Sequence, residues 1–182
     1  MDAQGREILT FLPGEVPQEL GEFSDAQCVA AAKLLRSLHD ATTDCTLRGS
    51  NEVVCHGDAS PCNCVFVDGI PQGFIDFDSA HAGTREDDVG YAAWLWLDIG
   101  NRDLDPKVQG HRLCDFVSAY DPAARLDAPQ LILSAQQRLS LRLDGPPGNR
   151  EWAQACLNWT QENWSQIKTA FDSRSGGSEF AR

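Results

Sequence analysis

The stretch that decides the fold runs from Cys55 to Asp78 and reads CHGDASPCNCVFVDGIPQGFIDFD. It opens with a His-Gly-Asp turn, has an Asn five residues after that Asp, and ends in Asp-Phe-Asp. The part CVFVDGIPQGFIDFD predicts two short strands around Asp68-Gly69, because Asp-Gly is a preferred turn of β-hairpins. Pairing of these strands would bring the last carboxylates back beside the loop that holds the first.

The polar residues of this stretch suit phosphoryl transfer. Transfer from ATP needs a carboxylate that orients the acceptor hydroxyl, and oxygen ligands for Mg²⁺. Asp58 on the turn, Asn63, and Asp76 at the end of the second strand provide these groups. Hard oxygen ligands of this kind favour magnesium over a soft metal.

Helical patterns dominate the rest of the chain. Pro13, Gly14 and Pro17 oppose a long helix in residues 1–23, which we expect to be extended. Ser24 and Gln27 form a capping box before a helix that runs to about residue 42. A short strand is expected at 53–55, and helices at about 87–100, 106–120, 127–143 and 149–171, the first of them closed by Gly100. The predicted fold class is α+β, mainly helical with one small β-hairpin.

Composition limits the classes of function. The 182 residues fit one domain or one large lobe, without an apolar run long enough for a bilayer and without a secretory signal, so a cytoplasmic protein with no membrane contact is the default. The net charge of −12 argues against nucleic acid as a partner and is compatible with a cationic small molecule.

Seven cysteines are an odd number for a disulfide framework. Cys55, His56, Cys62 and Cys64 cluster in the sequence, so a zinc-stabilised structural domain is one alternative. Their C-x-C spacing, without a second C-x-x-C pair, favours reduced, half-buried thiols instead.

The motifs HGDASPCN and IDFD, in this order and spacing, resemble the catalytic and metal-binding motifs of the aminoglycoside phosphotransferase (choline kinase-like) family, the small-molecule relatives of protein kinases. The flanks agree along nearly the whole chain. FLPGEVP resembles the family's hinge, AAKLLRSLHDAT its first large-lobe helix, DDVGYAAWLW the helix after the metal loop, and RLCDFVSAYD a later helix. The resemblance implies a protein-kinase-like C-terminal lobe whose hairpin carries the metal-binding Asp.

The resemblance also assigns roles to residues around the turn. It implies that Asp58 is the catalytic base and that Asn63 and Asp76 hold the Mg²⁺ ions that bridge the phosphates of ATP. His56 would shape the catalytic loop, although a hydrogen-bonded core histidine is the structural alternative. Gly57 stands where protein kinases usually carry Arg, and Asp88 would hydrogen-bond the backbone of the loop.

Two further groups are expected at the ends of the site. Thr10, Phe11 and Leu12, at the hinge, would contact the base of ATP. Glu86 and Asp87, which follow the metal loop, are expected to line an acidic cleft near Asp58 that takes the small acceptor.

The resemblance covers a large lobe alone. The chain holds no G-x-G-x-x-G loop, and its three lysines, Lys33, Lys107 and Lys168, lie outside the predicted strands. We therefore expect a hinge-like segment at 1–23, the lobe at 24–172 and a disordered tail at 173–182. The predicted activity is transfer of the γ-phosphate of ATP to a hydroxyl of a small molecule, weak in this chain unless an oligomer or another chain supplies the small lobe. A non-catalytic binding or scaffold protein is the other alternative.

Overall fold

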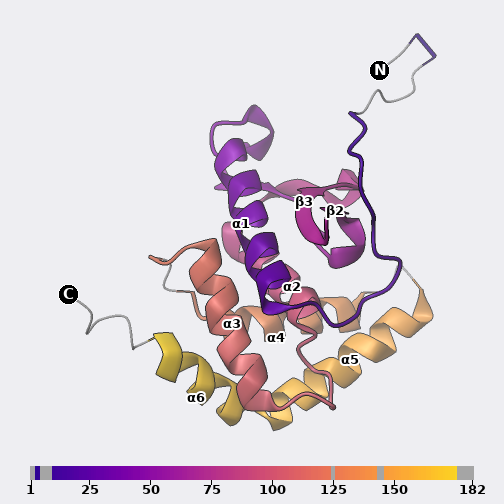
Figure 1. Cartoon of the computed structure of the whole chain (residues 1–182). Helices are drawn as coiled ribbons and strands as arrows, with labels where there is room; N and C mark the ends of the chain where they lie inside the picture. Colours follow the sequence, from indigo (N-terminus) through magenta and orange to yellow (C-terminus); the bar gives the residue numbers. More distant parts are fainter. Residues whose placement is uncertain (1–2, 5–9, 124–125, 143–145, 176–182) are drawn as a thin grey trace.

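The chain folds into a mainly helical structure with two small pairs of strands. The computed structural model describes residues 3–4, 10–123, 126–142 and 146–175 (Figure 1). Its helices are α1 (Asp25–Thr42), α2 (Arg85–Leu97), α3 (Pro106–Tyr120), α4 (Ala128–Leu141), α5 (Pro147–Glu162) and α6 (Trp164–Ser175). Its strands are β1 (Val53–Cys55), β2 (Cys64–Val67), β3 (Ile70–Phe74) and β4 (His81–Gly83). The expected α+β class is confirmed.

Both strand pairs are antiparallel. β2 and β3 form the predicted hairpin, in which Val67 pairs with Ile70 and Cys64 with Phe74. β1 pairs with β4 from Val53 opposite Gly83 to Cys55 opposite His81. The sequence predicted β1 but not β4, because three residues that end in Gly carry almost no strand signal.

Helix α2 is the centre of the core. Nine of its residues are buried, from Asp88 to Leu97, with Tyr91 half-buried among them. In Figure 1, α1 and the β2–β3 hairpin lie above α2, and α3 to α6 lie below it. A Cβ on Gly90 would lie 2.8 Å from Cβ of Leu131, so α2 and α4 pack closely here. Helix α2, buried from Asp88 onward, therefore serves as the scaffold for the loops around it.

Two of the predicted helices differ from the helices in the structure. The expected helix at 149–171 is two helices, α5 and α6, which meet at Asn163. The side chain of Asn163 donates to the carbonyl of Trp159 at 2.9 Å, and its own carbonyl accepts from Ile167. Such local bonds of Asn compete with a continuous helix. Helix α2 ends at Leu97, because Asp98 and not Gly100 takes the left-handed cap position with φ 52°.

The structure describes residues 10–23 of the expected hinge-like segment and the first residues of the predicted tail. Residues 10–23 are largely irregular, and Glu15 exchanges two backbone hydrogen bonds with Phe66 of β2, at 2.9 and 2.7 Å. The hinge-like segment therefore runs along the outside of the hairpin. Helix α6 continues to Ser175, and the rest of the predicted tail lies outside the described residues.

The described helices include none that is both long enough and apolar enough to cross a membrane.

Candidate active site

The turn at His56–Asp58 is held by a buried carboxylate. Asp88, in the first turns of α2, accepts the backbone N–H of His56 at 2.6 Å and that of Gly57 at 2.9 Å. Burial alone would raise the pKa of Asp88, but the hydrogen bonds from His39 and from the two backbone N–H groups outweigh it and hold the pKa below its usual value. Asp88 is therefore ionised, and its two hydrogen bonds hold the backbone at His56 and Gly57.

A chain of buried polar groups supports Asp88 from behind. Nε2 of His39 lies 3.1 Å from Asp88, and Nδ1 lies 2.7 Å from the hydroxyl of Tyr120. Because an ionised carboxylate only accepts, Nε2 carries a proton and donates it to Asp88, and Nδ1 shares a hydrogen bond with the hydroxyl of Tyr120. Arg85 in turn donates to the Tyr120 oxygen at 3.4 Å. Helices α1, α2 and α3 each contribute to this chain.

His56 links the turn to the hairpin. Its ring is fully buried, Nε2 lies 3.0 Å from the carbonyl of Ile75, and Nδ1 lies 3.3 Å from the backbone N–H of Asp58, which donates to it. Nε2 therefore donates, and both ring nitrogens are satisfied. The side chain packs in the core and at the same time joins the turn to the residue before Asp76.

Gly57 lets the turn approach the following loop. Its φ is +80°, and a Cβ there would lie 2.2 Å from the carbonyl oxygen of Ser79. A larger residue would be strained by its backbone conformation and would also collide with this carbonyl. The close contact brings the loop after Asp76 against the His56–Asp58 turn.

Asn63 connects Asp58 and Asp76. Its side-chain N–H donates to the carbonyl of Asp58 at 3.0 Å, and its own carbonyl accepts the N–H of Ile75 at 2.9 Å. Within the described chain, no hydrogen bond uses its side-chain oxygen. Asp76 is exposed, has a left-handed backbone with φ 63° and ψ 69°, and makes no capping bond to the short turn at Phe77–Ser79. The fold thus brings the three residues of the predicted site together.

Of the three residues expected to contact the base of ATP, one lines a hollow and two do not. Leu12 lines a hollow of about 550 Å³ between the hinge-like segment and the hairpin. The other lining residues are Pro13, Val65, Val67, Asp68, Ile70, Gln72 and Gly73. Thr10 and Phe11 are exposed outside it, with 84% of Phe11 accessible.

The sequence profile of the phosphotransferase enzyme family matches residues 46–152, which is more than half of the chain and contains the whole site from His56 to Asp88. This chain belongs to the phosphotransferase enzyme family. The matched region leaves out the hinge-like segment, α1, the second half of α5 and α6.

A curated relative supports the same family. The trifolitoxin immunity protein of Rhizobium leguminosarum bv. trifolii is 29% identical over 121 residues, which make up 59% of this chain and 46% of the relative. The chain thus matches less than half of the length of this relative. No solved structure matches.

Helix α2 approaches the loop around Asp58 through two more residues, which the sequence reasoning missed. The indole N–H of Trp96 donates to the carbonyl of Ala59 at 2.9 Å. The phenol of Tyr91 lies near the Asp58 carboxylate, and burial together with this negative charge raises the pKa of Tyr91. The signal that could have found both is helical spacing, since they follow Asp88 by three and eight residues on one helix.

Of the two carboxylates expected to line an acidic cleft, Asp87 is already bound to other side chains. Asp87 accepts from the hydroxyl of Thr84 at 2.8 Å and pairs with Arg138 at 3.2 Å. Glu86 is exposed at the start of α2. The positive charges of Arg142 and Arg138 act on the phenol of Tyr91 and lower its pKa, so both charges lie in the neighbourhood of Asp58.

The thiols near the site do not resemble zinc ligands. Cys55 and Cys64 are buried, and burial raises their pKa values to about 12 and about 11. Cys55 donates to the carbonyl of Thr84 at 3.2 Å. In the part of the chain that the structure describes, no three His, Cys, Asp or Glu side chains form a metal-binding group.

Proposed function

We propose that the chain contains the catalytic half of an ATP- and Mg²⁺-dependent phosphotransferase that phosphorylates a hydroxyl of a small molecule. The observation that carries the proposal is the connection made by Asn63, which donates to the backbone of Asp58 and accepts from the residue before Asp76. A base and two metal ligands need such fixed relative positions, because phosphoryl transfer depends mainly on positioning and on charge stabilisation.

In this proposal Asp58 orients the acceptor hydroxyl and takes its proton. Asn63 and Asp76 are the magnesium ligands, and their side-chain oxygens fit the role. The side-chain oxygen of Asn63 makes no hydrogen bond in the described chain, and the exposed Asp76 carboxylate makes no capping bond. When bound, Mg²⁺ stabilises the charge that spreads over the transferred group. His56, Gly57 and Asp88 hold the loop in place and do not react.

The nucleotide base would enter the hollow between the hinge-like segment and the hairpin. Leu12 and Val65 offer apolar contact there, and at Gly73 a Cβ would lie 2.9 Å from Cδ1 of Leu12, so a side chain would narrow the hollow. Of the predicted hinge contacts, Leu12 is the one on which this part of the proposal rests.

The charge that meets the phosphates would come from a small lobe or a partner chain. Lys33, Lys107 and Lys168 lie on α1, α3 and α6, and none of the three lies on a strand. We therefore expect these 182 residues alone to turn over slowly, since loss of one such electrostatic contact costs on the order of 10²–10³ in rate.

On the acceptor side, the proposal keeps Glu86 as the carboxylate for a cationic acceptor, because Asp87 already pairs with Arg138. A second candidate function follows from the relative named as an immunity protein. In that case the lobe would bind a toxin without phosphorylating it, which is the non-catalytic alternative.

Thermal unfolding with and without Mg²⁺ and ATP tests the metal site. We expect the ligands to raise the melting temperature of the wild-type chain and to have a smaller effect on Asp76→Ala and Asn63→Ala. Asp103→Ala, which removes an exposed carboxylate outside the site, is the matched control. Equal shifts in all four proteins would remove Asn63 and Asp76 from the site.

Transfer of labelled γ-phosphate then separates the two candidate functions. A phosphotransferase gives a slow rate that disappears in Asp58→Ala. Saturable binding of trifolitoxin that is the same in wild type and Asp58→Ala, without any transfer, supports the binding protein.

A further inference from the structure

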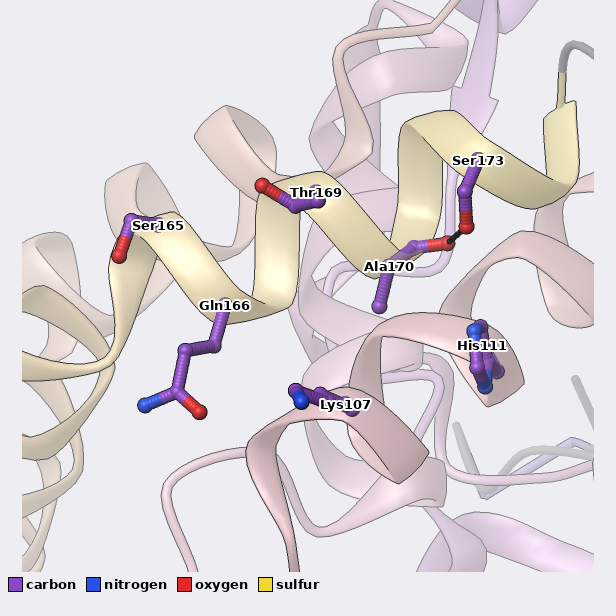
Figure 2. A pocket seen from close by; sticks show the side chains of 7 residues that line it. All are labelled: Lys107, His111, Ser165, Gln166, Thr169, Ala170 and Ser173. Atoms are coloured by element: carbon purple, nitrogen blue, oxygen red, sulfur yellow. Dashed lines mark hydrogen bonds between the residues drawn. The ribbon is translucent and has the colours of Figure 1, made fainter.

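A second hollow lies between α3 and α6. It has a volume of about 350 Å³ and shares no lining residue with the site around Asp58. Its lining residues are Lys107, His111, Ser165, Gln166, Thr169, Ala170 and Ser173 (Figure 2). We call it the α3–α6 groove.

The two helices run in the same direction along the groove. A Cβ on Gly110 would lie 2.4 Å from the carbonyl oxygen of Ile167, and further along Arg174 pairs with Asp115 at 3.0 Å. Both helices therefore begin at the end of the groove where Lys107 lies, and the positive ends of their dipoles add to its charge. Figure 2 shows Lys107 and His111 on α3 below the edge of α6 that carries Gln166 and Ala170.

The lining of the groove is rich in hydrogen-bond donors. An ammonium, an imidazole, an amide and the hydroxyls of Ser165 and Thr169 can donate, whereas the hydroxyl of Ser173 already donates to the carbonyl of Ala170 at 2.9 Å. None of the seven lining residues carries a carboxylate. The methyl group of Ala170 and the side-chain stems give it an apolar base. This combination suits a small oxyanion that carries a short apolar body.

The positive charge of the groove is not neutralised within the described structure. Asp115 pairs with Arg174 at 3.0 Å and Asp172 with Lys168 at 3.3 Å, so these carboxylates already have cationic partners. Asp105 caps α3 through the backbone N–H of Lys107 at 2.7 Å. The side chains of Lys107 and His111 make no ion pair or hydrogen bond to any described residue. In a chain with a net charge of −12, this is a local site for an anion.

We propose that the α3–α6 groove binds a small organic anion, a phosphate monoester or a carboxylate, through Lys107 and His111. The ligand's charged group lies between these two side chains and Gln166, and its apolar part lies against Ala170. This site is separate from the proposed catalytic one and needs neither ATP nor magnesium.

A titration followed by amide chemical shifts tests the groove, with inorganic phosphate, phenyl phosphate, benzoate and tetramethylammonium as probes. It is run without nucleotide or magnesium. We expect saturable shifts confined to residues 107–111 and 165–173 for the anions and none for the cation. Tighter binding of phenyl phosphate or of benzoate decides between the two anion classes. Tighter binding of tetramethylammonium would overturn the proposal.

Charge-matched variants show whether the groove itself is responsible. Lys107→Gln and His111→Gln should each weaken anion binding roughly three- to tenfold, because the first removes a charged contact and the second removes the imidazole that donates to the anion. Lys168→Gln and Lys33→Gln remove charged groups outside the groove and should change binding less than about twofold, the effect of net charge alone. If all variants weaken anion binding equally, or if the chemical-shift changes are scattered over the surface, the binding follows from the net charge of the protein and not from the groove. Because Asp58→Ala and Asp76→Ala should leave this binding unchanged, failure of the proposed function and failure of this site are distinguishable.

Discussion

The two oxygens of Asp88 hold two consecutive backbone N–H groups, Oδ2 that of His56 at 2.6 Å and Oδ1 that of Gly57 at 2.9 Å. The carboxylate is 2% exposed, so water cannot replace it as an acceptor. A single side chain of α2 thus determines the course of the backbone that leads to Asp58.

Replacing Asp88 by Asn should lower the free energy of unfolding by about 2–4 kcal/mol, because an amide can accept from only one side and loses the charged hydrogen bonds. Urea unfolding measures the loss. Asp103→Asn, an exposed control, should change the unfolding free energy by less than about 0.5 kcal/mol. A loss below about 1 kcal/mol in Asp88→Asn would mean that the turn holds its shape without the charge.

The same carboxylate should make stability depend on pH. Its native pKa is lowered, mainly by the hydrogen bonds that outweigh burial, so its contribution is complete above the unfolded value of about 3.9 and is lost as the pH falls through the native value. Unfolding midpoints between pH 7 and pH 3 should therefore fall more steeply in wild type than in Asp88→Asn. Parallel curves would show that other carboxylates, such as Asp40 and Asp87, account for the acid sensitivity.

Gly57 and Gly69 form a matched pair for testing the contact with Ser79. Both have positive φ, +80° and +75°, but a Cβ would lie 2.2 Å from the Ser79 carbonyl at Gly57 and would meet nothing within 4 Å at Gly69. Gly69→Ala should cost about 1–2 kcal/mol for the backbone conformation alone. Gly57→Ala should cost clearly more in urea unfolding. Similar losses would show that the loop after Asp76 moves away freely.

Tyrosine ionisation reports the contact between Tyr91 and Asp58. The chain has two tyrosines, and the pKa of Tyr91 is raised by burial and by the Asp58 charge. Asp58→Asn should therefore shift one tyrosinate absorbance transition to lower pH, because the negative charge beside the phenol is gone. The shift should persist with Tyr120→Phe and vanish with Tyr91→Phe. If Asp58→Asn leaves both tyrosinate transitions unchanged, the Asp58 carboxylate does not act on the phenol of Tyr91.

Thiol reactivity should follow burial. Cys45 and Cys62 are half-buried and the other five cysteines are buried, with the pKa values of Cys28 and Cys156 raised to about 11 by burial. A thiol reagent at mildly alkaline pH should modify at most two of the seven cysteines in the folded protein and all seven in denaturant. One firmly bound zinc per chain would contradict this prediction and favour the structural zinc domain.

Local signals in the sequence were strong enough to predict several elements. The Asp68-Gly69 turn gave the hairpin, and the Ser24–Gln27 capping box gave the start of α1, where the N–H of Gln27 donates to Ser24 and the Gln27 side chain accepts in return. Each of these signals lies within four residues, so it does not depend on the rest of the fold.

Features that depend on distant contacts could not be predicted in the same way. β4 exists because it pairs with β1, which ends 26 residues before it begins. The exposed state of Phe11 and the ion pair of Asp87 with Arg138 likewise follow from tertiary packing. The motifs indicated Asp58, Asn63 and Asp76, which the fold brings together, whereas the supporting residues Tyr91, Trp96 and His39 appear only once α2 is placed in the fold.

The hydrogen-bonded chain from Arg85 through Tyr120 and His39 to Asp88 has one further consequence. All of its members come from α1, α2 and α3, so the loop that carries Asp58 is preorganised by the helices before any ligand arrives. A nucleotide or an acceptor would then meet a rigid template, and little of the binding free energy would be spent on ordering it. The adaptable part of such a site is whatever approaches the template from outside, so changes of substrate in this architecture can arise there without altering the helices that shape the loop.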